Sequence, residues 1–272
     1  MALLSVALLK LVRRPATWIV FAILAGLIAL VFISLGATAG SMESMGDELQ
    51  IRVLLDFPTA YTIVAGFVVG FGGLLAVAYG AAVIGADWAW GTIRAIVARG
   101  ESRVRYTLVT FLAIALIVGL GVTFAFVIGI GSAILAAEMA GIGSSGATDA
   151  DTLASLPGLL ARTWLGVAQA AAVGFAIAML FKSQLAGIGA GLAFYFAEQF
   201  LQLVPALRDV LIYFPFSVSS AVVATTDAFD PDTSFGNFPV LDADTAVVWS
   251  IGYLVVALAV ACLAAWRAQI TQ

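Results

Sequence analysis

The apolar run TWIVFAILAGLIALVFISLGA occupies residues 17–37 and contains no charged side chain. A helix of about 20 apolar residues is long enough to cross the hydrocarbon core of a bilayer. The rest of the 272-residue chain has the same character, because 63% of its residues are hydrophobic, only 10% are charged, and the mean hydropathy is +1.12. A soluble domain carries about a quarter of its residues as charged side chains. The composition therefore excludes a water-soluble fold and predicts an all-α integral membrane protein.

Six segments are long enough for a membrane span when charged residues and prolines are taken as boundaries. The third is long for one crossing, which favours a tilt or an extension beyond the bilayer. A seventh apolar run, residues 210–224, is shorter and contains Pro215, so we expect a re-entrant or interfacial element between spans five and six. No shift in composition marks a second domain, so we expect residues 1–272 to form a single transmembrane domain. The expected spans are residues 17–37, 58–84, 106–137, 159–181, 185–204 and 245–266.

The positions of the few basic residues predict the orientation of the chain. An even number of spans places both termini on the same side, and nine of the twelve Lys and Arg residues fall on that side. Cytoplasmic loops of membrane proteins carry an excess of Lys and Arg. We therefore expect a multi-pass protein of the cell (inner) membrane with both termini in the cytoplasm. The nine residues are Lys10, Arg13, Arg14, Arg94, Arg99, Arg103, Arg105, Lys182 and Arg267.

The residue inventory excludes several classes of function. Histidine is absent and Cys262 is the single cysteine, so no zinc cluster, disulfide framework or histidine-based catalytic triad can form. Neither Lys10 nor Lys182 follows the glycine-rich spacing of a phosphate-binding loop. The net charge of -4 argues against nucleic acid as a partner. We therefore expect no enzyme activity, no metal and no cofactor bound by this chain.

The first 14 residues form an apolar arm that ends in basic residues. Lys10, Arg13 and Arg14 follow the helical spacing i, i+3, i+4 and therefore cluster on one side of a helix. A helix that lies in the membrane interface, with its leucines in lipid and its bases at the headgroups, fits this pattern. These three residues are the predicted membrane-interface anchor. The alternative is a basic flank that only fixes the topology.

The loop between spans two and three, residues 85–105, is amphipathic. Gly91 and Gly100 bracket a predicted helix of about two turns, with Thr92 near its start. A short helix of this kind can serve as a rigid docking element for a soluble partner. The alternative is a basic loop that is needed for topology alone.

Two stretches of the chain carry a resemblance to a known family. The loop has an acidic residue, Asp87, followed by Gly91-Thr92-Ile93-Arg94 and later by Ser102-Arg103, and residues 213–217 are Tyr-Phe-Pro-Phe-Ser. In this order, within a six-span frame that starts with an interfacial helix, they resemble the membrane subunits of ABC transporters of the type-two exporter class. Asp87 stands where that family more often has Glu.

The resemblance implies a permease subunit of an ATP-driven exporter. The loop helix would be a coupling helix that docks on a separate ATPase subunit, expected in two copies, which binds the ATP and Mg. Two permease chains, either identical or paralogous, would face each other in the lipid bilayer around a substrate path. The residues that the resemblance assigns to ATPase coupling are Asp87, Trp88, Gly91, Thr92, Arg94, Arg99, Ser102 and Arg103.

Glu198 is an ionisable residue inside the expected fifth span, which makes it a candidate functional residue. Tyr195 and Gln199 accompany it on one partly polar stripe, and Phe67 and Phe71 of span two are further candidates for the substrate path or for gating. The alternatives for Glu198 are a hydrogen bond between helices or a solvated position near the outer interface. An ion- or proton-coupled secondary transporter that uses Glu198 is the alternative function.

Two pairs of glycines have the spacing of small residues at close helix contacts. Gly66 and Gly70 lie in span two, and Gly187 and Gly191 lie in span five. They predict close packing either between two permease chains or within one chain.

Overall fold

The computed structural model describes residues 2–39, 53–224 and 241–268, and within these ranges it contains helices and no strand. Two short 3-10 turns, Ser145–Thr148 and Pro205–Leu207, connect longer elements. The helices of the first half are α1 (Ala2–Val12), α2 (Pro15–Ala39), α4 (Thr59–Ala89), α5 (Thr92–Ala98) and α6 (Arg103–Met139). Those of the second half are α7 (Ala150–Phe181), α8 (Gln184–Leu201), α9 (Arg208–Leu211), α10 (Pro215–Ala221) and α11 (Ala243–Arg267).

Five helices in the described part of the chain are long and apolar enough to cross a membrane: α2, α4, α6, α7 and α11. The prediction of an all-α protein with several membrane-spanning helices is therefore confirmed. Helix α8 covers most of the expected fifth span, but it has 18 residues and is not among these five. The six-span layout stays a prediction.

Some helices differ in length or continuity from the expected segments. Helix α6 has 37 residues, so the long third span is one continuous helix. The run 210–224 is not one helix: it holds the end of α9 and all of α10, which begins at Pro215. A proline is well accommodated in the first turn of a helix, where its missing N–H needs no partner.

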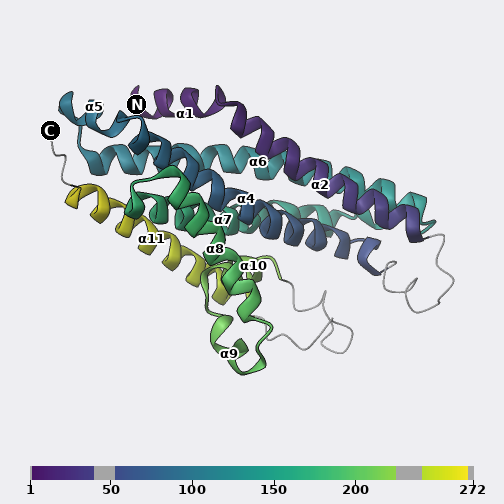
Figure 1. The fold of residues 1–272 in the computed structure, drawn as a ribbon. Coiled ribbons are helices and arrows are strands. Elements are labelled where there is room, and N and C mark those ends of the chain that lie inside the picture. Colours follow the sequence, from purple (N-terminus) through teal and green to yellow (C-terminus); the bar gives the residue numbers. More distant parts are fainter. Residues whose placement is uncertain (1, 40–52, 225–240, 269–272) are drawn as a thin grey trace.

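Helix α4 lies in the middle of the bundle and packs against α7, α8, α6 and α2 (Figure 1). The contact with α7 is close because glycines form it. A methyl group on Gly80 would overlap the backbone of Ala171, and one on Gly174 would overlap the backbone of Val77. Helices α2 and α11 keep most of their surface exposed, as helices that face lipid do.

The two glycine pairs behave differently. Gly187 lies against Ala178 of α7, and Gly191 lies against Val77 of α4, so this pair packs within the chain. Gly66 and Gly70 have open space where a side chain would be. The spacing alone did not separate these two outcomes.

Helix α5 lies at the end of the bundle that also holds α1 and the last turns of α11, and we call this the α5 end (Figure 1). The turn from α7 to α8 lies there too, because Gly85 near the end of α4 lies against the backbone of Gln184. Helix α1 is separate from α2 and packs against α6. Its side chain Leu11 is buried, whereas Val6 and Leu9 are exposed.

Candidate functional site

Helix α5 is a short, defined element that joins two long helices. Gly91 and Gly100 flank it with φ angles of 68° and 84°, in the left-handed region that glycine adopts at little cost. Ile93 is 3% exposed and fixes the helix to the rest of the protein. On its other side Arg94 and Arg99 are exposed. A short helix bounded by these two glycines thus joins α4 and α6, and its outward side is basic.

Asp87 lies inside α4 and is fully buried, so it does not reach the surface of the loop. The ammonium group of Lys10 forms an ion pair with Asp87 Oδ1, and the hydroxyl of Tyr106 donates to Oδ2 over 2.6 Å. Arg14 Nη2 lies 3.9 Å from Oδ1. A buried carboxylate is tolerated only when it is paired and hydrogen-bonded. Asp87 therefore joins α1, α4 and α6 beneath the loop.

Trp88 also belongs to α4 and faces the protein rather than the outside. Its indole Nε1 donates to the sulfur of Met179 over 3.0 Å. The ammonium group of Lys182 lies 5.6 Å from the centre of its ring, within the range of a cation–π interaction. Trp90, two residues later, is 71% exposed and is the tryptophan that the loop presents outward.

The three predicted anchor residues have different surroundings. Lys10 and Arg14 turn towards Asp87, and the guanidinium of Arg14 also lies over the ring of Trp90, 5.4 Å from its centre. Arg13 is exposed. Two of the three bases thus hold the arm to the bundle, a role that the amphipathic pattern did not reveal.

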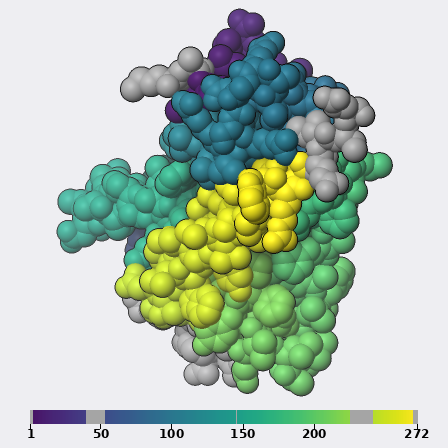
Figure 2. Space-filling view, turned by 90° about the vertical axis from the view of Figure 1, so that its left-hand side faces the viewer, coloured from purple at the N-terminus to yellow at the C-terminus, as the bar shows by residue number. Residues whose placement is uncertain are grey.

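Ser102 and Arg103 start α6 and connect the loop to α11. Ser102 is the N-cap of α6, and Arg103 donates to the carbonyl of Ala268 just after α11. Between the loop and α11 lies a hollow lined by Val97, Glu101, Ser102, Arg103, Val104 and Trp266. Figure 2 looks onto this end, where the segment around α5 (blue) lies beside the end of α11 (yellow). Thr92 opens α5 and is half-buried.

Glu198 is fully buried and binds the first turn of α10. Its Oε2 accepts a hydrogen bond from the backbone N–H of Phe216 over 3.2 Å, and its Oε1 accepts from the backbone N–H and the hydroxyl of Ser217. Gln202 donates to the same hydroxyl over 2.7 Å. Unpaired N–H groups at a helix start favour a negative charge, which explains how a carboxylate is accommodated here. Of the three alternatives, the geometry matches a hydrogen bond between helices.

The remaining path residues divide between the interior and the surface. Tyr195 donates to the carbonyl of Gly70 over 2.7 Å and packs against the ring of Phe216. Phe67 and Phe71 stack on each other with ring centres 4.6 Å apart, and Phe71 is 44% exposed. Gln199 is half-buried. Tyr195 thus connects α8 to α4 and lies beside Phe216, which donates to Glu198.

A second buried polar group was missed by the sequence reasoning. Gln169 of α7 donates to the carbonyl of Pro215 over 2.8 Å and accepts from the hydroxyl of Ser250 over 3.1 Å. It thereby links α7, α10 and α11. The sequence signal that could have identified it is a single glutamine within an apolar span.

Among the described residues, no group of three or more Asp, Glu, Cys or His side chains lies together as a metal site would require. A scan against protein-family models and a search of curated protein sequences both found no match to this chain.

Proposed function

We propose that this chain is the membrane permease subunit of an ATP-driven exporter of the ABC type and that α5 is its docking element for a separate ATPase subunit. The observation that carries the proposal is the exposed basic side of α5, with Arg94 and Arg99 directed away from the anchored Ile93. A soluble partner with an acidic or polar cleft would complement this side.

The surroundings of α5 suit the transmission of force. Asp87 lies four residues before Gly91 on the helix that leads into α5, and its buried ion pair and hydrogen bond hold that helix to α1 and α6. Closely packed elements with satisfied polar groups move as units rather than deform locally. A displacement of α5 would therefore be passed to α4, the central helix of the bundle.

The proposed topology has six spans, with α8 as the fifth. Helix α8 starts at the α5 end, and Glu198 near its other end meets α10, which contacts the middle of α7 through Gln169. Helix α10 would then be a re-entrant element in the half of the membrane away from α5. With six spans, α1, α5 and the end of α11 all lie in the cytoplasm, where the excess of basic residues belongs.

The proposed assembly contains two permease chains and two ATPase subunits. The open positions at Gly66 and Gly70 and the exposed ring of Phe71 leave part of one side of α4 uncovered by the described residues. Small residues on an open helix surface let another membrane helix approach closely. This side of α4 is where we propose that a second permease chain packs, with the substrate path between the two.

The arrangement around Glu198 supports this function over an ion- or proton-coupled carrier. A coupling carboxylate must exchange its proton or ion with a water-filled path. Glu198 is enclosed and accepts three hydrogen bonds from Phe216 and Ser217. Its geometry is that of a residue that positions α10.

The test is co-purification and hydrolysis. The chain is co-expressed with candidate ABC ATPase subunits from its source genome, the complex is isolated through a tag on the chain, and ATP hydrolysis is measured in vesicles. Arg94→Glu is expected to reduce the bound ATPase about tenfold or more, because reversing a charge at an interface costs several kcal/mol. Arg162→Gln, which removes a base paired with Asp244 far from α5, is the control and should retain the partner. A chain that purifies alone under these conditions contradicts the proposal.

A further inference from the structure

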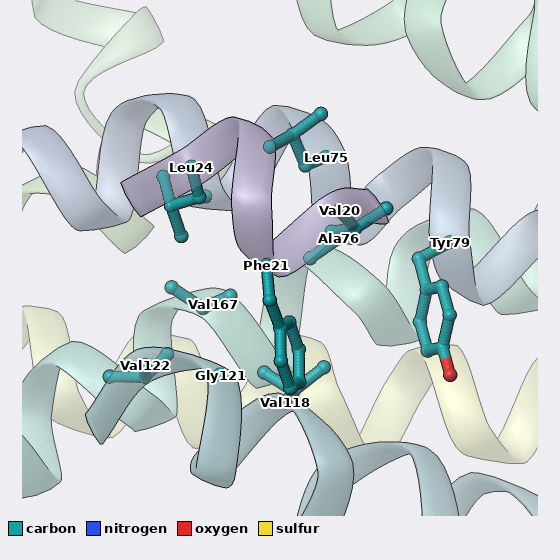
Figure 3. A pocket seen from close by; sticks show the side chains of 11 residues that line it. Val20, Phe21, Leu24, Leu75, Ala76, Tyr79, Val118, Gly121, Val122 and Val167 are labelled. Carbon is teal, nitrogen blue, oxygen red and sulfur yellow. The ribbon is translucent and has the colours of Figure 1, made fainter. Parts of the chain in front are cut away.

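An apolar pocket lies between α2, α4, α6 and α7. Its enclosed volume is about 30 Å³, and on one side the pocket is open to the surroundings. Figure 3 shows that Phe21 of α2 points across it towards Val118 of α6, while Tyr79 of α4 lies at one edge. Val20, Phe21 and Leu75 are only half-buried, so the pocket reaches the surface that faces lipid. The lining residues are Val20, Phe21, Leu24, Gly72, Leu75, Ala76, Tyr79, Val118, Gly121, Val122 and Val167.

The polar groups nearest the pocket lie towards the α5 end. The hydroxyl of Tyr79 forms a 2.8 Å hydrogen bond with the hydroxyl of Thr17, which in turn donates to the carbonyl of Leu11. Arg14 precedes Thr17 by three residues and therefore lies about one helical turn nearer to the α5 end. The pocket is thus apolar along α2 and becomes polar where α2 begins.

Arg14 has hydrogen-bonding capacity that the described residues do not use. Its Nη2 atom is buried and has no hydrogen-bond partner among them, and Asp87 Oδ1 at 3.9 Å is too distant for one. A buried donor that lacks an acceptor is costly and uncommon in folded proteins, so such a donor points to a bound group that accepts from it. An anionic oxygen beside Arg14 would be this acceptor.

The charge balance around Arg14 favours an anion. Lys10, Arg13 and Arg14 bring three positive charges to the turn between α1 and α2, and Asp87 forms an ion pair with Lys10 and lies 3.9 Å from Arg14. Trp18 and Trp90 are exposed at the same end, 58% and 71%, as aromatic side chains at the headgroup level of a bilayer are. A membrane with anionic lipids is therefore the complementary surrounding.

We propose that this protein binds one anionic phospholipid, with an acyl chain in the pocket between α2, α4 and α6 and the headgroup phosphate at Arg14. From Arg14 to Leu24 a helix rises about 15 Å, so the pocket lies at the depth of the acyl chain when the phosphate is at the membrane surface. Arginine is suited to this phosphate because its planar guanidinium can donate two parallel hydrogen bonds to it. The inference rests on the membrane location of the chain and is independent of its coupling to an ATPase.

The experiment uses the full chain in phosphatidylcholine vesicles. A small fraction of phosphatidylglycerol carries a photoreactive diazirine on its acyl chain, and a parallel sample carries the same diazirine chain on phosphatidylcholine. After illumination, peptide mapping by mass spectrometry locates the adducts. We expect the phosphatidylglycerol adducts on the pocket-lining segments of α2, α4 and α6 to exceed the phosphatidylcholine adducts about fivefold, the gain from one basic residue at a membrane surface.

Three variants separate the headgroup from the acyl chain. Arg14→Gln should reduce the phosphatidylglycerol signal to the phosphatidylcholine level. Val20→Phe fills the open side of the pocket and should reduce adducts from both lipids in α2 and α6. Arg162→Gln, far from Arg14 and paired with Asp244, should leave both signals unchanged. Size-exclusion elution as a single peak identifies variants that are folded.

If Arg14→Gln does not fold, the comparison of phosphatidylglycerol and phosphatidylcholine adducts on the wild-type chain decides the proposal. Equal labelling by the two lipids, or adducts spread evenly over all lipid-facing helices, overturns it. A third sample contains millimolar inorganic phosphate, and a fourth contains unlabelled phosphatidylglycerol. Loss of the excess with the lipid alone supports a lipid site, whereas equal loss with phosphate identifies a free-phosphate site and overturns the lipid assignment.

Discussion

Lys10 and Asp87 lie 77 residues apart in the sequence and form an ion pair inside the protein. The pair fastens the N-terminal arm to the last turn of the central helix α4, directly before Gly91 and the start of α5. Tyr106 completes the attachment from α6. The attachment of α1, α4 and α6 to one another at this point thus depends on one carboxylate.

Removing the charge of Asp87 should destabilise the protein. Asp87→Asn leaves Lys10, whose side chain is 31% exposed, without its partner, and because solvent screens part of this pair the loss should be about 1–3 kcal/mol. The free energy of unfolding in mixed micelles of increasing denaturing detergent measures the loss. Lys10→Met should cost a similar amount, and the double variant should cost clearly less than the sum of the two. Strict additivity would contradict a direct pair.

The hydrogen bonds of Glu198 should hold α10 in its position. Glu198→Gln replaces one acceptor oxygen by a donor and weakens the bonds from Phe216 and Ser217 by about 1–3 kcal/mol. Hydrogen exchange over residues 216–221 should therefore become faster. Glu138→Gln, which alters an exposed carboxylate bonded to Ser144, is the matched control and should leave this segment unchanged. Unaltered exchange in the Glu198 variant would show that α10 is held by other contacts.

Two glycines of the bundle should respond in opposite ways to the same substitution. Gly174→Ala introduces a methyl group that overlaps the backbone of Val77, so it should lower the free energy of unfolding by about 1–3 kcal/mol. Gly189→Ala adds a methyl group to open space on the exposed side of α8 and should be neutral or slightly stabilising. Thermal unfolding followed by tryptophan fluorescence compares the two. Equal losses would indicate that α4 and α7 are not in close contact.

The sequence predicts those features that depend on local chemistry. The apolar runs define α2, α4, α6, α7 and α11, and the glycines at 91 and 100 define α5, because span length and left-handed backbone are properties of short segments. It does not predict the partners of polar residues. Asp87 stands in an amphipathic stretch and could equally face solvent or Lys10, since only the packing of α1 on the bundle decides between them.

In the candidate site, too, the sequence predicts local features but not the contacts between distant segments. The basic side of α5 follows from the positions of Arg94 and Arg99 on a short helix. The enclosure of Glu198 required α10 to fold back towards α8, a contact between segments that no periodicity describes. Arg14 was expected at the lipid headgroups, and its guanidinium also lies 3.9 Å from Asp87 and over the ring of Trp90, two neighbours that the amphipathic pattern does not describe.

The most direct test of the proposed coupling is a crosslink from α5 to the ATPase. In a Cys262→Ala background, Ala95→Cys places a single thiol on the exposed side of α5, and Ala206→Cys places one in the segment between α8 and α10 as a control. The complex with the co-expressed ATPase is treated with a short thiol-directed photocrosslinker and examined by mass spectrometry. We expect a crosslink between permease and ATPase for Ala95→Cys and none for Ala206→Cys. No crosslink from Ala95→Cys in an intact complex, or equal crosslinks from both positions, would contradict docking of the ATPase on α5.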